Sequence, residues 1–170
     1  MNFYGNFYLG VATDEEQPGY DSDLPWVSSN SDLDSTEWIR AQKVREAMSL
    51  AIDREGIINT LLLGFAKPAM LESYTGNEDV LPPGLEWKFD RDRDTELLVE
   101  ADYADGFTAT LTTALRGAPA EVAVCEAVAG MLDAIGINVQ FQNFSYSTLR
   151  PTIVGRTYNG MTCHGIPIRT

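Results

Sequence analysis

Few side chains in this sequence could perform catalysis or bind a metal ion. The single histidine, His164, directly follows Cys163, a pair that could supply a nucleophile and a base or two metal ligands. The pattern over 161–164 predicts a strand, in which adjacent side chains point to opposite faces. The two groups therefore cannot act on the same atom, and a hydrolase that uses them is a minor alternative.

A second candidate is the acidic run over 90–94, which imitates the opening of a calcium-binding loop. Such a loop needs glycine at its sixth position and glutamate at its twelfth, where this chain has Thr95 and Ala101. The acids are better explained as the capped beginning of a helix, whose positive end they stabilise. We therefore predict a protein that is not an enzyme and that carries no metal ion or cofactor.

The composition narrows the classes of partner. The 170 residues include 25 acidic and 12 basic side chains, which gives a net charge of −13. Binding to phosphates requires clustered lysine and arginine, so neither nucleic acid nor an anionic membrane surface is the expected partner. The acidity is compatible with export. The first ten residues lack the basic and apolar regions of a signal peptide.

The two cysteines, Cys125 and Cys163, match no zinc-binding spacing. Cys125 falls in a predicted helix and Cys163 in the predicted last strand. We interpret them as two buried free thiols. A disulfide is the alternative if the chain lies outside the cytoplasm, where thiols are oxidised.

The helices follow from apolar residues that repeat at helical spacing. Asp53 can cap a helix that follows directly on another, and Gly64 stands where that second helix ends. The predicted helices are 36–52, 54–63, 94–101, one that begins near Pro119 and stops at Gly136, and a short one within 146–154.

Alternation of apolar and polar residues predicts strands over 107–115 and 137–142, and an aromatic run predicts another over 2–11. A strand, a helix and a second strand after a single glycine form a β-α-β unit. The expected fold is therefore α/β, with a mixed sheet flanked by helices.

The segment 14–34 is rich in acidic residues, serine, proline and glycine, and is predicted to be a long surface loop. Within it, Pro25-Trp26-Val27 is expected to act as an apolar anchor. We treat residues 1–170 as a single domain that contains this loop.

Several short segments follow one another in an informative order. They are Glu37-Trp38; Val44-Arg45 with Ala51-Ile52-Asp53-Arg54, Ile57-Ile58 and Gly64; Trp87-Lys88-Phe89-Asp90 before Leu97-Leu98; Ala101-Asp102-Tyr103; Asp105-Gly106-Phe107; and Gly136-Ile137. The series resembles family 5 of the bacterial extracellular solute-binding proteins, the peptide- and nickel-type receptors of ABC importers.

This resemblance implies the first part of the second large lobe of a two-lobed receptor with the type II periplasmic-binding-protein fold. Members of the family are several times longer, so the chain is expected to be a fragment that lacks the other lobe. The implied function is to bind a peptide-like or other small polar solute, in the periplasm or outside the cell, for the membrane subunits of an ABC importer. A standalone structural or interaction domain is the alternative.

The resemblance also suggests which residues contact the ligand after the last strand. Peptide-binding members commonly carry a "GWxxDY"-like run there, with an aromatic residue and an aspartate that hold the ligand. Ile166 and Arg169 stand at those positions here. Arg169 would favour a carboxylate, a phosphate or a hydroxyl-rich ligand, and His164 is a further candidate contact.

In this family the opening strand contributes aromatic residues to the cleft. Tyr4 and Tyr8 are therefore expected to meet the ligand, with Phe3 and Phe7 as the other choice. Only one of these two sets can face the ligand, because side chains alternate along a strand.

Overall fold

The computed structural model describes residues 2–5, 23–28, 30, 32–68, 80–155 and 160–165, with the backbone alone for 2–5. The elements are β1 (Asn2–Gly5), α1 (Thr36–Leu50), α2 (Arg54–Leu61), α3 (Arg91–Glu100), β2 (Phe107–Leu115), α4 (Glu121–Asp133), β3 (Ile137–Ser145), α5 (Tyr146–Val154) and β4 (Met161–His164).

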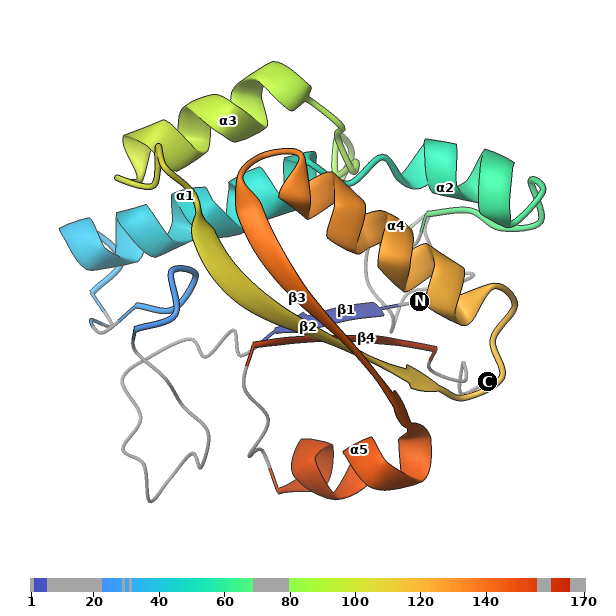
Figure 1. Ribbon diagram of the computed structural model, residues 1–170. Helices are drawn as coiled ribbons and strands as arrows, with labels where there is room; N and C mark the ends of the chain where they lie inside the picture. Colours follow the sequence, from blue (N-terminus) through green and yellow to red (C-terminus); the bar gives the residue numbers. More distant parts are fainter. Residues whose placement is uncertain are drawn as a thin grey trace.

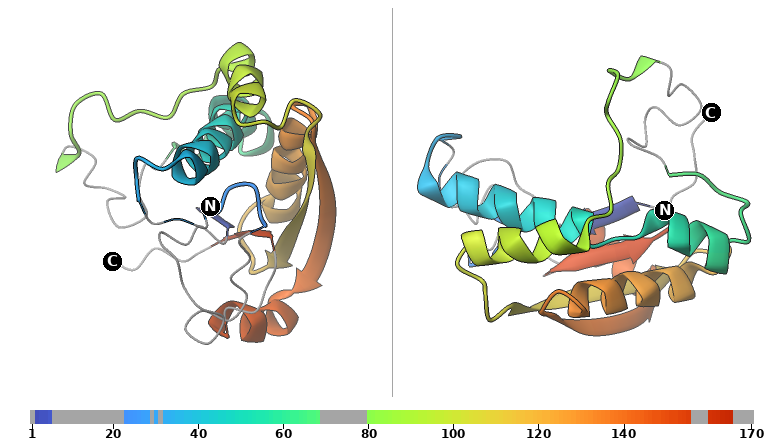
Figure 2. Two further views of the ribbon diagram at one scale, coloured as in Figure 1. Left: turned by 90° about the vertical axis from the view of Figure 1, so that its left-hand side faces the viewer. Right: turned by 90° about the horizontal axis from the view of Figure 1, so that it is seen from above.

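The strands form one mixed sheet in the order β1-β4-β2-β3. β2 runs parallel to both of its neighbours, and β1 runs antiparallel to β4. Helices α1 to α4 lie on one side of the sheet and α5 lies on the other (Figure 1). In Figure 2, α1 and α3 lie side by side at the far end from α5. The predicted α/β class and mixed sheet are confirmed.

The boundaries differ from the predictions in a few places. Helix α3 begins earlier than expected because Asp90 caps it: the Asp90 carboxylate accepts a hydrogen bond of 3.0 Å from the backbone N–H of Arg93. The first two helices end at Leu50 and Leu61. The strand predicted over 2–11 is described as far as Gly5, and the rest of it lies outside the described residues.

The core fills the space between the sheet and helices α1 to α4. Its large members with less than 2% of their surface exposed include Trp26, Val44, Leu97, Leu98, Leu111, Leu132, Ile137 and Met161. Trp26 is completely buried, with its ring 6.1 Å from that of Phe107. The apolar anchor predicted within the loop is therefore confirmed, whereas residues 14–22 of that loop lie outside the described part of the chain.

The joint between α1 and α2 explains why Asp53 and Arg54 stand together. The Asp53 carboxylate caps α2 by accepting a 2.8 Å hydrogen bond from the N–H of Gly56. The Arg54 guanidinium donates to the carbonyls of Ser49 and Ile52, at 3.0 and 3.1 Å, and so closes the end of α1. It also lies 4.0 Å above the centre of the Trp87 ring. One dipeptide thus ends one helix and begins the next.

Two glycines bring the starts of β2 and β3 together. Phe107 pairs with Ile137 at the first position of the parallel ladder, and Gly106 and Gly136 directly precede them. Gly106 has a φ of 70°, and a Cβ atom placed on it would overlap the carbonyl oxygen of Gly136. Only glycine satisfies both conditions, because L-residues avoid this φ and because there is no room for a side chain.

Asp94, in the first turn of α3, is the least satisfied charged group of the core. It is 0% exposed. Its Oδ1 accepts from the Thr95 hydroxyl at 2.9 Å, but Oδ2 has no hydrogen-bond partner in the part of the chain that the structure describes. Burial raises the pKa of Asp94, against weaker lowering by hydrogen bonds to Thr95. A carboxylate ionised in this position destabilises the folded state.

We expect Asp94→Ala to raise the free energy of unfolding at pH 7 by about 1–3 kcal/mol, the usual cost of an unsatisfied buried polar group. Because the folded pKa lies above the unfolded one, protonation favours the folded wild type. The difference in free energy of unfolding between Asp94→Ala and the wild type should therefore become smaller as the pH falls through the folded pKa of Asp94. Urea unfolding at several pH values measures this. Asp92→Ala, at an exposed acid of the same turn, is the control, and a destabilised Asp94→Ala would contradict the expectation.

Candidate functional site

The carboxyl ends of three parallel strands meet at one edge of the sheet. Arg116 directly follows β2, Tyr146 directly follows β3, and β4 ends at His164. In open α/β sheets, ligands bind just outside the carboxyl ends of the strands. We call this group, Arg116, Tyr146, His164 and Gly165, the ligand edge.

The side chains of the ligand edge touch one another. The guanidinium carbon of Arg116 lies 4.1 Å from the centre of the Tyr146 ring, and that ring lies 6.1 Å from the His164 ring. Nη1 of Arg116 donates a 3.0 Å hydrogen bond to the carbonyl of Gly165. Arg116 is otherwise exposed. Stacking and this single bond hold the guanidinium in place, although a guanidinium has five N–H donors in all.

His164 is buried, at 4% exposure, between the charged groups of this edge. The pKa of His164 is lowered, mainly by burial and secondly by the positive charge of Arg116. The negative charge of Glu121 acts in the other direction and raises it. The imidazole is therefore neutral at pH 7, when it can either donate or accept a hydrogen bond but adds no positive charge.

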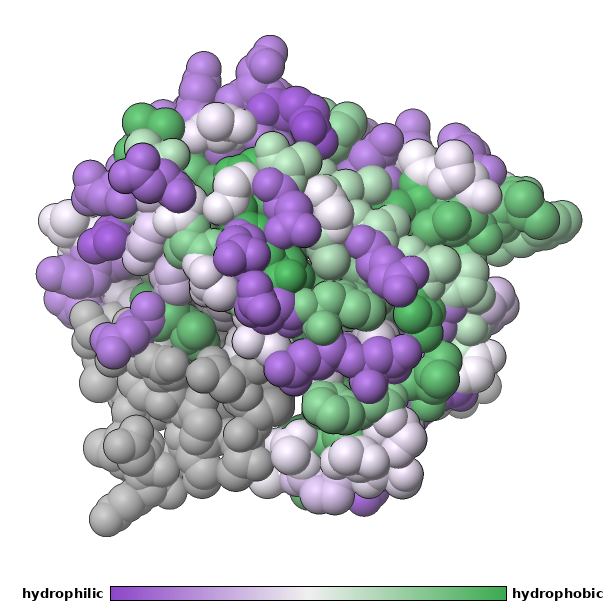
Figure 3. Space-filling model, in the orientation of Figure 1, coloured by the Kyte–Doolittle hydropathy of each residue, from purple (hydrophilic) through white to green (hydrophobic). Residues whose placement is uncertain are grey.

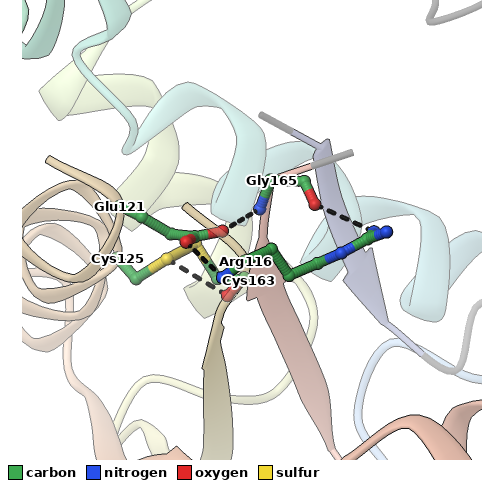
Figure 4. Close-up of a disulfide and its surroundings, with 5 residues drawn as sticks. All are labelled: Arg116, Glu121, Cys125, Cys163 and Gly165. Carbon is green, nitrogen blue, oxygen red and sulfur yellow. Dashed lines mark hydrogen bonds between the residues drawn. A yellow bond between two sulfur atoms is a disulfide. The ribbon is translucent and has the colours of Figure 1, made fainter. Parts of the chain in front are cut away.

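A buried carboxylate supports the ligand edge from behind. Glu121, in the first turn of α4, is 2% exposed. Its Oε2 accepts from the N–H of Arg116 at 2.6 Å, and its Oε1 accepts from the N–H of Gly165 at 2.5 Å (Figure 4). Oε2 also accepts from the N–H of Gly117 at 3.0 Å. Burial alone would raise the pKa of Glu121, but these hydrogen bonds lower it overall. The carboxylate is therefore a stable anion that ties two strand ends together.

A disulfide joins Cys125 on α4 to Cys163 on β4, next to this carboxylate (Figure 4). The interpretation as two free thiols is therefore wrong. The β-α-β arrangement packs α4 against β4 and brings the two Cα atoms within 5.8 Å, although 38 positions separate them in the sequence. A sulfur in a disulfide is not a thiolate, which removes the nucleophile from the hydrolase alternative.

Of the four residues predicted to contact the ligand, the structure describes the side chain of only one, His164. His164 lies at the ligand edge. The backbone of Tyr4 pairs with Thr162 in β4, and its side chain is outside the described part of the chain. Tyr8 and Arg169 also lie outside the described residues. That these four residues bind ligand stays a prediction.

Sequence reasoning missed Arg116, Tyr146 and Glu121. The sequence did contain a signal for Arg116, because this residue directly follows a predicted strand of a β-α-β unit. The residues that follow parallel strands lie at the same edge of the sheet. Tyr146 was hidden because β3 continues to Ser145, past the predicted end of that strand. Glu121 was hidden because acids are rarely buried and no sequence pattern marks a buried one.

Two hollows flank the sheet. An apolar cavity of about 450 Å³ lies between the end of α2 and the beginning of α4, and the green area at the right of Figure 3 marks the exposed end of α2 beside it. Leu63 and Phe65 there are 75% and 90% exposed. A more polar cavity of about 320 Å³ lies between α5 and the sheet. Its lining residues are Thr110, Thr112, Gln142, Phe144, Thr148, Leu149 and Thr152.

The residues that the structure describes contain no cluster of three or more acidic, histidine or cysteine side chains suited to a metal ion. Among the same residues, no helix has both the length and the apolar composition needed to cross a membrane.

Comparison with known proteins decides the class. Residues 9–163 match the family described as bacterial extracellular solute-binding proteins, family 5, middle. The chain belongs to this family. The resemblance inferred from the ordered segments is thereby confirmed.

The chain is also similar to individual members of family 5. It is 40% identical over 76 residues to the glutathione-binding protein GsiB of Salmonella choleraesuis (strain SC-B67), which is 41% of this chain and 13% of that protein. With GsiB of Escherichia coli (strain K12) it shares 33% over 105 residues, 58% of this chain and 19% of that protein. The chain therefore matches only a small part of these relatives.

Solved structures show the same fold. The oligopeptide-binding protein AppA of Bacillus subtilis, in complex with a nonapeptide, matches 74% of this chain and 28% of its own with a TM-score of 0.61 at 24% identity. A dipeptide-binding protein of Pseudoalteromonas sp. SM9913, in complex with Met-Leu, matches 73% and 25% with a TM-score of 0.58 at 25% identity. The type II periplasmic-binding-protein fold is thus confirmed.

Proposed function

We propose that this chain is part of the substrate-binding component of an ABC importer and that it holds a peptide-like or other small polar solute at the ligand edge. The observation that carries the proposal is the Arg116 guanidinium, stacked on Tyr146 at the carboxyl ends of the parallel strands. A planar, fixed guanidinium is suited to bind a carboxylate through two parallel hydrogen bonds. Glutathione, a nonapeptide and Met-Leu, the ligands named for three related proteins, all carry a free carboxylate.

The mechanism would be binding without covalent chemistry. Arg116 would anchor a carboxylate, the Tyr146 ring would keep the guanidinium in one plane, and the neutral His164 would exchange a hydrogen bond with a polar group nearby. One sheet edge desolvates only one side of a ligand, so a second lobe would have to close over it. The isolated chain is therefore expected to bind weakly or not at all.

One further feature supports this setting. A buried disulfide is typical of proteins that fold in an oxidising compartment, which supports a periplasmic or extracellular location. The partners would then be the remainder of the receptor and the membrane subunits of the importer.

One observation favours the alternative of an interaction domain. Leu63 and Phe65 expose apolar surface beside the apolar cavity at the end of α2, and surfaces of this kind usually contact another chain or domain. In the proposed receptor, the same surface would face the rest of the receptor.

The decisive test uses the complete receptor that contains this sequence. Calorimetric titration compares Met-Leu with its C-terminal amide, and glutathione with the form amidated at both of its carboxyl groups. We expect Arg116→Ala to weaken binding of the free acids by about 10- to 100-fold, the value of a charge-assisted hydrogen bond, because the carboxylate loses its anchor. Amides should bind weakly to the wild type and change little in the variant.

Arg150→Ala is the matched control, since Arg150 is an exposed arginine on α5 that takes no part in the ligand edge. Equal binding of acids and amides, or an Arg116→Ala receptor with wild-type affinity, would contradict the carboxylate anchor. Tight binding by the 170-residue chain alone would contradict the shared cleft.

A further inference from the structure

Helix α4 holds the end of β4 at two points. Cys125 is bonded to Cys163, and the Glu121 carboxylate accepts from the N–H of Gly165. The two helix positions are one turn apart, about 6 Å along the axis. Cys163 lies in β4 and Gly165 directly follows the strand, so the two are two residues apart, about 6.6 Å in extended backbone. Because the two spacings are similar, one turn of α4 can form both a disulfide to Cys163 and a charged hydrogen bond to Gly165.

The same carboxylate also holds the end of β2. Its Oε2 accepts from the N–H groups of Arg116 and Gly117, and the Arg116 side chain in turn donates to the carbonyl of Gly165. The contacts therefore form a closed ring from Glu121 through Gly165 and Arg116 back to Glu121 (Figure 4). Moving any one member would break bonds to both of the others.

Because Glu121 is buried, this ring of contacts depends on the charge of the Glu121 carboxylate and on its hydrogen bonds. A buried anion is tolerated only while its hydrogen bonds are intact, because an unpaired buried charge is costly. There is no room for substitution at the other end, since a Cβ on Gly165 would lie 2.8 Å from the Cβ of Ala118 and 2.9 Å from Oε1 of Glu121. The ring can therefore accommodate little change in position.

We propose that Glu121 and the Cys125–Cys163 disulfide are positioning residues, which fix Arg116 and the turn that begins at Gly165 in the geometry that receives the ligand. The proposal rests on the proposed function in naming Arg116 as the ligand anchor. Neither Glu121 nor the disulfide touches the ligand. Their effect on binding passes through the orientation of the guanidinium and of the Gly165 backbone.

The first test is amide hydrogen exchange, measured by NMR on the 170-residue chain. In Glu121→Gln, and separately in the double variant Cys125→Ala/Cys163→Ala, exchange at Arg116, Gly117 and Gly165 should rise at least about tenfold through local opening. Exchange along the β2–β3 ladder should stay at the wild-type rate in Glu121→Gln. Glu126→Gln, at an exposed acid of the same helix, should change none of these amides. Unchanged exchange at the three amides in either variant, or an equal rise across the domain in Glu121→Gln, would overturn the proposal.

The second test measures binding in the complete receptor, again with Met-Leu and its C-terminal amide as probes. Glu121→Gln should weaken binding of the free acid about tenfold and leave the amide nearly unchanged, because the anchor is misplaced rather than removed. A purely structural role would weaken both probes alike, which would overturn the proposal. If the wild-type receptor binds neither probe, the proposed function fails, and hydrogen exchange alone then decides whether the ring fixes this edge.

Discussion

Replacing both Cys125 and Cys163 by alanine is expected to lower the free energy of unfolding by about 4 kcal/mol. The disulfide closes a loop across a sequence separation of 38. In the chain-entropy description, a loop of this length removes conformational freedom from the unfolded chain worth about 4 kcal/mol at 25 °C. Alanine is the appropriate replacement, because serine would leave two hydroxyl groups in a site where both residues are at most 2% exposed.

Urea unfolding followed by tryptophan fluorescence measures this loss, since Trp26 is buried in the folded state. The matched control is the wild type unfolded with and without a reductant. Reduction should lower its stability by nearly the same amount, because both treatments open the same loop. A loss below about 1 kcal/mol would contradict the expectation, which assumes that the unfolded chain is largely unconstrained.

Gly106→Ala is expected to lower the free energy of unfolding by at least about 3 kcal/mol. The φ of 70° alone makes alanine unfavourable by about 1–2 kcal/mol. The new Cβ would also overlap the carbonyl oxygen of Gly136, which belongs to the backbone and has no rotamer by which to move aside. The first pair of the β2–β3 ladder would have to separate.

Gly130→Ala is the matched control for this substitution. Gly130 lies inside α4, and a Cβ placed on it meets no atom within 4 Å. Alanine there should raise stability by up to about 1 kcal/mol, because glycine is a poor helix former. Thermal and urea unfolding of both variants should therefore give opposite signs. A Gly106→Ala chain as stable as the wild type would show that the starts of β2 and β3 can move apart freely.

Local patterns in the sequence were sufficient to predict most of the fold. Asp53 marks the beginning of α2 through capping, and the left-handed Gly64 follows shortly after the helix ends at Leu61, features that are decided within a few residues. The alternation over 107–115 gives β2 correctly, because that strand is central and its faces differ. Prediction ended too early for β3 because this edge strand is largely exposed beyond Phe141, and exposed residues need not alternate.

The candidate site was less predictable because it depends on approach between distant segments. Cys125 pairs with Cys163 because of the way α4 packs across the sheet, and the spacing of the two cysteines in the sequence does not reveal this packing. Glu121 reads as an ordinary acid at the start of a helix, where its charge is favourable anyway. Its burial against Arg116 and Gly165 appears only when both strand ends are in place. The residues closest to the proposed ligand are thus those that local patterns describe least.

The antiparallel pair of β1 and β4 has a consequence for how the chain folds. Its register joins Asn2 to His164 and Gly5 to Met161, so it connects segments from nearly opposite ends of this sequence. Contacts between such distant segments form slowly, because a long loop must be closed before they contribute stability. On the ribosome, β2, α4 and β3 can assemble as soon as they emerge. β1 is made before the other strands of this sheet, and its pairing with β4 cannot form until β4 has been made.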